Sequence, residues 1–193
     1  MTKLINLLGD IHMTKSHKIK TDDPWHLTQS DIGIKVTNFE LQLWRVFYGF
    51  IRWQEECERG VNNTGLTANE IAVLHIIRMK ERPKTIYDIG RLLNRDDTFN
   101  IHYSIRKLLK MGLIKKTKSD QAGKKTFAYQ TSDAGTKNTD TFTEMRNHIL
   151  LEMYSQEKEL NLVELAKALS KVNALYDEAD RAVASYTKPP AEE

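Results

Sequence analysis

The chain has 193 residues, enough for one compact domain or for a small domain with long helical extensions. Apolar residues make up 40% and charged residues 28%, which argues against a disordered or a membrane protein, and the net charge of +3 is mild. Cys57 is the single cysteine, so an intramolecular disulfide is excluded. Because the sequence has neither a secretory signal nor an apolar span of about 18 residues, we expect a cytoplasmic protein without membrane contact.

The first part of the chain predicts an arm followed by a long helix. Residues 1–26 mix charge, histidine and threonine without a helical period, and we interpret them as an N-terminal arm. From Leu27 to Cys57 the apolar residues recur at helical spacing, with Thr28 or Ser30 available as the N-cap. A loop is expected from Gly60 to Gly65, where glycines and asparagines gather.

The next helix opens with a capping box. Thr67 and Glu70 have the spacing at which side chain and backbone cap each other at a helix start. This helix should run to about Lys80, because the step from Arg82 to Pro83 blocks continuation. Its predicted core face consists of Ile71, Val73, Leu74, Ile77 and Met79.

Two further helices have the order of a helix-turn-helix. Thr85 can cap a helix from Ile86 to about Leu93, and Asp96 or Asp97 can cap a second one that ends near Met111, before Gly112. The second helix has an apolar face made of Ile101, Ile105, Leu108 and Leu109. Its other face carries Asn100, Tyr103 and Arg106. Packing and recognition are thereby separated on one helix.

A basic hairpin follows. Leu113–Ser119 and Thr126–Thr131 have strand character, and Gly123 lies in the turn between them. Between Arg106 and Lys125 the sequence has one acidic residue, Asp120. The same segment has eight basic residues, Arg106, Lys107, Lys110, Lys115, Lys116, Lys118, Lys124 and Lys125. An isolated lysine cluster is most often a solvated surface, but beside a helix-turn-helix it favours nucleic-acid binding.

The C-terminal part predicts two more helices, one from Asp133 to about Glu157 and one through Leu162 to about Tyr186. Their apolar stripes are Phe142, Met145, Ile149 and Tyr154 in the first, and Leu162, Leu165, Ala166, Leu169, Val172 and Tyr176 in the second. Residues 188–193, which begin with Lys-Pro-Pro, are expected to form a disordered tail. The fold class is therefore mainly α with a small β-hairpin wing.

From about Leu27 to Leu175 this succession resembles the MarR family of transcription regulators. The segments that carry the resemblance are Thr67–Leu74, Asp88–Leu93, Ile101–Gly112, Leu113-Ile114, the hairpin, and Gln130-Thr131 before Gly135. The resemblance implies a DNA-binding lobe at 67–132 between dimerisation helices at 27–66 and 133–187. It also implies a homodimer whose recognition helices enter the major groove of double-stranded DNA. A narrower similarity is to an alphaproteobacterial branch that includes regulators of L,D-transpeptidase genes.

Several residues are candidates for DNA contact. On the second helix of the motif, they are Thr98, Asn100, His102, Tyr103 and Arg106, among which asparagine and arginine match the edges of adenine and guanine. Lys107, Lys124 and Lys125 are assigned to phosphates. The wing of MarR-like proteins usually carries Asp-x-Arg, but here no arginine follows Asp120. Because lysine suits the minor groove less well than arginine, we expect the wing to contact phosphates instead. Asp96 and Asp97 would repel phosphates unless paired, for which Arg91 or Arg95 is available.

A ligand pocket is also implied by the resemblance, since MarR-like proteins often bind small organic anions or phenolic acids. Its candidate residues are Trp44, Arg45, Tyr48, His75 and Arg78. Aromatic residues at helical spacing are more often core residues, so both interpretations stay open.

Other chemistry finds little support in the sequence. Glu55, Glu56 and Glu58 would disfavour a thiolate at Cys57, and the histidines do not form a ligand-spaced cluster, so we expect neither a redox thiol nor a metal or cofactor. Catalytic motifs are also missing, and we do not expect an enzyme. The alternative to a DNA-binding regulator is a winged helix that mediates protein assembly. Charge reversal at Lys124 and Lys125 would distinguish the two, because only the first would lose DNA affinity.

Overall fold

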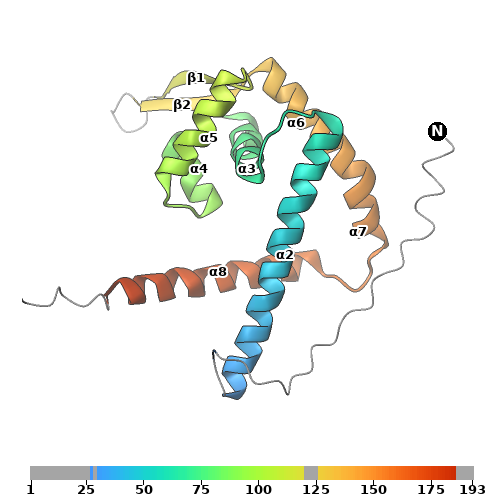
Figure 1. The fold of residues 1–193 in the computed structure, drawn as a ribbon, viewed down its shortest axis with the longest axis vertical. Coiled ribbons are helices and arrows are strands. Elements are labelled where there is room, and N and C mark those ends of the chain that lie inside the picture. The colour runs from blue at the N-terminus through green and yellow to red at the C-terminus, as the bar shows by residue number, and fades with distance from the viewer. Residues whose placement is uncertain (1–26, 28–29, 120–125, 186–193) are drawn as a thin grey trace, which may run out of the picture. The chain divides into compact units, whose positions relative to one another are not determined.

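The computed structural model describes residue 27 and the ranges 30–119 and 126–185 (Figure 1). Along the chain its elements are α2 (Asp31–Val61), α3 (Ala68–Arg78), a 3₁₀ turn η1 (Met79–Glu81), α4 (Ile86–Leu93), α5 (Thr98–Lys110), β1 (Ile114–Ser119), β2 (Thr126–Thr131), α6 (Asp133–Arg146), a π-helical turn η3 (Asn147–Leu151), α7 (Glu152–Gln156) and α8 (Leu162–Ser185). The mainly helical architecture with one antiparallel hairpin confirms the expected fold class. The predicted arm at 1–26 and the predicted tail at 188–193 lie outside the described residues.

The chain divides into two compact units, which meet within α2, between Trp53 and Gln54. In the first unit, the backbone N–H of Gly33 donates to Oγ of Ser30 at 3.2 Å, so Ser30 is the N-cap of α2. Thr28, the other predicted cap, is outside the described residues. Large apolar side chains along this part of the helix remain exposed, among them Phe39, Phe47 and Phe50.

The second unit begins with the last turns of α2, which continue to Val61. The prediction of a loop starting at Gly60 is therefore wrong. The physical reason is a set of contacts with a distant part of the chain. The buried carboxylate of Glu58 accepts hydrogen bonds from Asn62, Thr64 and Asn138, which holds the end of the helix against α6. This network outweighs the cost of about 1 kcal/mol for a glycine within a helix.

Helices α3, α4 and α5 surround the core of the second unit. Its central side chains are at most 2% exposed and include Ile71, Val73, Leu74, Ile77, Ile89, Ile101, Ile105 and Leu108. These burials confirm most of the core faces predicted for α3 and α5, although Leu109 is only partly buried. Met79, predicted on the same face of α3, is 44% exposed. That prediction is wrong because α3 ends at Arg78 and the chain turns away through Lys80 and Glu81, both at positive φ.

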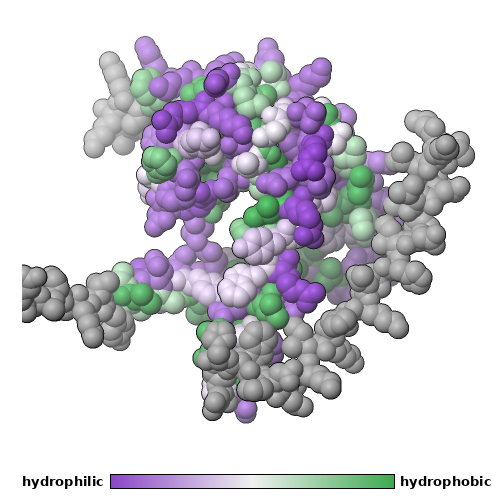
Figure 2. Space-filling view, in the orientation of Figure 1, coloured by the Kyte–Doolittle hydropathy of each residue, from purple (hydrophilic) through white to green (hydrophobic). Residues whose placement is uncertain are grey.

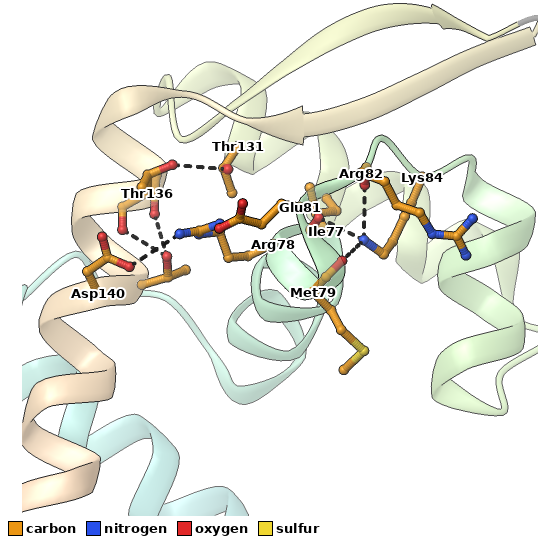
Figure 3. Close-up of polar contacts among 11 residues, drawn as sticks. Ile77, Arg78, Met79, Glu81, Arg82, Lys84, Thr131, Thr136 and Asp140 are labelled. Atoms are coloured by element: carbon orange, nitrogen blue, oxygen red, sulfur yellow. Dashed lines mark hydrogen bonds and ion pairs between the residues drawn. The ribbon is translucent and has the colours of Figure 1, made fainter.

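A buried lysine closes the C-terminal end of α3. The ammonium group of Lys84, a residue 1% exposed, donates to the backbone carbonyls of Ile77 at 3.1 Å, of Arg82 at 3.0 Å, and of Met79 (Figure 3). The Lys84 backbone also forms a bridge with Tyr129 of β2, through two hydrogen bonds of 2.9 and 2.8 Å. Helix ends leave carbonyls without partners, so this cation satisfies the end of α3 and joins it to the hairpin.

Helix α6 packs closely against the base of the hairpin. Ser132 caps it, because the backbone N–H of Gly135 donates to Oγ of Ser132 at 3.1 Å. Immediately beside this turn lies Leu113, whose carbonyl oxygen accepts from the N–H of Ser132 at 3.0 Å. A Cβ at position 135 would lie 1.8 Å from that oxygen. The close approach of α6 to the hairpin therefore requires glycine at this position.

The C-terminal helices differ from the predicted pattern in their packing. The helix expected from Asp133 to Glu157 is confirmed in outline, with a π-helical turn in its middle. Phe142 of its stripe is buried, whereas Ile149 and Tyr154 are exposed. Helix α8 has no buried residue, and Figure 2 shows hydrophobic side chains among hydrophilic ones on its visible face. Among the described helices, none has the length and hydropathy of a membrane span.

Candidate nucleic-acid interface

The start of α5 is fixed by a salt bridge. Arg95 donates to the carboxylate of Asp97, the N-cap residue, from Nε at 2.8 Å and from Nη2 at 2.6 Å. The amide of Asn100 donates to the same carboxylate at 2.8 Å. The hydrogen bonds from Arg95 and then from Asn100 lower the pKa of Asp97 to about 2. The expected pairing of an aspartate with Arg95 is confirmed, so this charge is compensated at the start of α5.

The turn between α4 and α5 is tight. The N–H of Arg95 donates to the carbonyl of Gly90 at 2.9 Å, and Asn94 between them has a positive φ of 52°. A Cβ at Gly90 would lie 2.8 Å from the carbonyl oxygen of Arg95. The capping box of α4 adds a second constraint, since Thr85 and Asp88 cap each other. These local bonds set the direction in which α5 leaves α4.

Helix α5 has one buried and one exposed face. Ile101, Ser104, Ile105 and Leu108 are buried. Of the predicted DNA contacts on this helix, the exposed ones are Thr98, Asn100, His102, Tyr103 and Arg106. The structure thus brings these five residues together on one exposed surface. The prediction missed Phe99, which is 73% exposed on the same surface and which its position relative to the buried residues could have revealed.

Lys107, which was predicted to contact a phosphate, forms an ion pair within the protein. Its ammonium group lies 2.7 Å from the carboxylate of Glu70 and 3.1 Å from the carbonyl oxygen of Gly65. The Glu70 side chain is 4% exposed and also accepts from the N–H of Thr67 at 2.8 Å. Lys107 therefore ties α5 to the capped start of α3.

The hairpin presents further basic side chains. Strand β1 pairs with β2 in a register that places Ile114 opposite Thr131 and Ser119 opposite Thr126. Lys115, Lys116 and Lys118 are exposed on β1. The ammonium of Lys116 lies 4.0 Å from the centre of the Phe127 ring. Lys124 and Lys125, predicted to contact phosphates, lie outside the described residues. Among the eight basic residues of the segment from Arg106 to Lys125, the described and exposed ones are these three lysines of β1 and Arg106 and Lys110 of α5.

The candidate ligand residues fall into the two units of the chain. Trp44, Arg45 and Tyr48 lie on α2 in the first unit, and all three are exposed. His75 and Arg78 lie on α3 in the second unit, and both are partly buried.

The centroid of the His75 ring lies 4.6 Å from the centroid of the Phe142 ring. Burial lowers the pKa of His75, an effect that the Glu58 carboxylate partly offsets. Arg78 is engaged with acids, at 2.7 Å from Glu81 and 3.6 Å from Asp140 (Figure 3). Neither residue lines a cavity of ≈ 230 Å³ in the second unit, which is lined by Glu55, Glu58, Arg59, Asn63, Gly65, Leu66 and Thr67.

The thiol of Cys57 is buried, and burial followed by the nearby Glu58 carboxylate raises its pKa. A raised pKa disfavours the reactive thiolate. Across the described residues, His, Cys, Asp and Glu side chains do not gather in groups of three that could hold a metal ion.

Comparison with known proteins identifies the domain that contains α5 and the hairpin. Residues 66–135 match the family model of a winged helix DNA-binding domain. A search of curated proteins found no match.

Three similar solved structures are distant in sequence. FabT of Streptococcus pneumoniae, solved in complex with DNA, is 13% identical with a TM-score of 0.58, over 75% of this chain and 99% of that one. A MarR family transcriptional regulator of Silicibacter pomeroyi is 17% identical with a TM-score of 0.56, over 77% and 99%. The organohalide-sensing regulator RdhR, in its ligand-free form, is 17% identical with a TM-score of 0.58, over 91% and 99%. Residues 66–135 therefore form a winged helix DNA-binding domain, and the chain has the fold of the MarR-family transcriptional regulators.

Proposed function

We propose that this protein is a transcription regulator of MarR type, which binds a pseudo-palindromic operator in double-stranded DNA as a homodimer. The observation that carries the proposal is the division of α5 into a buried apolar face and an exposed face with Asn100, Tyr103 and Arg106. A helix-turn-helix places such a face in the major groove. The similarity to FabT, solved in complex with DNA, supports this role.

Two kinds of contact follow from the side chains. Arg106 has the paired donors that match the edge of guanine, and a good bidentate pair discriminates against the wrong base by about 1–3 kcal/mol. Lys110 and the exposed lysines of β1 would bind phosphates, which positions the protein without reading sequence. For a dimer that neutralises about eight phosphates, the logarithm of affinity should fall with the logarithm of salt concentration at a slope of about −7.

Exposed apolar faces support the homodimer. On α8, Leu162, Leu165, Leu169 and Tyr176 are each between 42% and 47% exposed. Phe39, Phe47 and Phe50 of the first unit are likewise 39% to 53% exposed. Apolar faces of this extent are typical of surfaces that another protein covers. A second copy of the chain is the partner that a two-fold symmetric operator requires.

Control of DNA binding by a small organic anion or phenolic compound is part of the proposal. RdhR, which shares the fold over most of this chain, is described as an organohalide sensor. Trp44, Arg45 and Tyr48 remain proposed for a ligand of the first unit, and His75 and Arg78 remain separate candidates in the second. A ligand would act by favouring a dimer whose two recognition helices are wrongly spaced for successive major grooves.

The test is selection of random-sequence duplexes with purified protein of dimer mass, at two salt concentrations. We expect an inverted repeat with half-sites about one helical turn apart. At about 1–3 kcal/mol per half-site, Arg106→Ala should lower the affinity of the dimer for it by about 30-fold to 25,000-fold and relax the preference at one position of each half-site. Arg59→Ala is the matched control. It removes the same charge from an exposed arginine of α2, outside the winged helix domain, and should keep the preference.

A dimer that enriches no motif and loses DNA at moderate salt would contradict the proposal. The same result would favour the winged-helix assembly module instead. For the ligand, a panel of phenolic acids should shift the midpoint of thermal unfolding and release the operator. If no phenolic acid shifts the midpoint or releases the operator, the proposed control by phenolic acids is wrong.

A further inference from the structure

Viewed along the helix axis, Phe99 projects from the middle of the exposed face of α5. It lies in the first turn of the helix, which begins at Thr98, and 73% of it is exposed. Successive residues of an α-helix are rotated by about 100°, so Arg106 and Lys110 each project within about 20° of the direction of Phe99. By the same geometry, the buried Ile101 and Leu108 project from the opposite side of the helix, about 160–180° away. Phe99 therefore points directly away from the core.

The surroundings of Phe99 select the kind of partner. Arg106 and Lys110 share its face, and both are exposed. Two cations that follow an aromatic ring on one helix face, about 10 and 16 Å further along the axis, match a partner that combines negative charge with an apolar group. The major groove of DNA has this composition, because the methyl group of thymine is the apolar group on its base edges, between two rows of phosphates. An apolar protein surface would instead leave both cations desolvated.

The polar neighbour of Phe99 is less free to read a base. The side-chain amide of Asn100 donates to the carboxylate of Asp97 at 2.8 Å, beside the salt bridge of Asp97 with Arg95. Asn100 also projects about 100° away from Phe99, towards the flank of the helix. The N-terminal residues of a recognition helix usually contact base edges. In this protein, Phe99 is the first-turn residue whose side chain is both exposed and central.

We propose that Phe99 determines part of the sequence specificity, by packing against the 5-methyl group of one thymine in each half-site of the operator. The proposal rests on the function proposed above and adds the base that the first turn of α5 reads. Loss of one methyl contact should weaken binding about fourfold, and loss of both in a dimer about fifteenfold.

The experiment uses the full-length protein and the operator from the selection. Each thymine of a half-site is replaced in turn by uracil, which lacks the methyl group and keeps the same hydrogen-bonding edge. We expect one position per half-site at which uracil weakens binding of the unaltered protein about fourfold, and about fifteenfold when both half-sites carry it. Phe99→Ala should bind the thymine operator about fifteenfold more weakly and no longer distinguish uracil at that position. Phe99→Leu keeps an apolar side chain and should retain part of the discrimination.

Tyr87→Ala is the control for removal of an exposed aromatic ring. Tyr87 is 78% exposed on α4, and its removal should leave the thymine preference intact. Circular dichroism checks that each variant is folded. An operator without a uracil-sensitive thymine, or a Phe99→Ala protein with unchanged discrimination, would overturn the role of Phe99 while the regulator function stands. Failure to enrich any operator would overturn both.

Discussion

Gly135 lies in the first turn of α6, where the helix passes the carbonyl of Leu113 at the base of the hairpin. In Gly135→Ala, the new Cβ would lie 1.8 Å from that carbonyl oxygen and 2.8 Å from its carbon. Carbon and oxygen atoms normally approach no closer than about 3.3 Å, so the backbone of α6 or of Leu113 must move by about 1.5 Å. Because the obstacle is backbone, a change of rotamer cannot relieve it.

The cost follows from what this movement disturbs. Overpacking costs about 1–3 kcal/mol, and the hydrogen bonds of Ser132 with Leu113 and with the N–H of Gly135 contribute about 1 kcal/mol each. Alanine gains about 1 kcal/mol over glycine in helix propensity. We therefore expect Gly135→Ala to lower the free energy of unfolding by about 2–4 kcal/mol.

Urea denaturation followed by circular dichroism measures this loss, at one fixed protein concentration because the stability of the proposed dimer depends on concentration. Gly60→Ala is the control. It also lies within a helix, but a Cβ there meets nothing within 4 Å, so this variant should gain about 0.5–1 kcal/mol. A Gly135→Ala protein as stable as the unaltered one would refute the close approach between α6 and Leu113.

Three further changes test the buried polar groups of the second unit. Lys84→Met keeps the length of the side chain but leaves the carbonyls at the end of α3 without their donor, and should cost about 2–3 kcal/mol in urea unfolding. Glu58→Gln removes the charge that three donors share and should cost a similar amount, about 2–3 kcal/mol, by the same measurement. The pKa of His75 is lowered from 6.5, so the unfolded chain binds more protons and stability should fall as pH drops from 6.5 to the folded pKa. His75→Gln should show a smaller difference in urea midpoint between pH 5 and pH 7.5, and an equal difference would contradict this account.

Local signals in the sequence determined most helix and strand boundaries. The caps at Ser30, Thr67 and Thr85 were predicted from residue type, because a cap needs only a side-chain acceptor a few residues from its donor. The buried face of α5 was predicted from helical periodicity, and the hairpin from two short runs around a turn. The exposure of Phe99 follows from the same periodicity, although Phe99 was not among the predicted contacts.

Contacts between residues far apart in the sequence were decided only by the tertiary structure. Nothing near Lys84 indicates that its ammonium closes α3 from inside the protein, and nothing near Lys107 indicates its ion pair with Glu70. The need for glycine at position 135 likewise depends on the carbonyl of Leu113. Residue type and periodicity describe one element at a time, whereas burial of a charge or close approach of two backbones depends on how elements pack. For that reason the sequence determined the elements and the exposed face of α5, and the fold decided which charged residues hold the protein together.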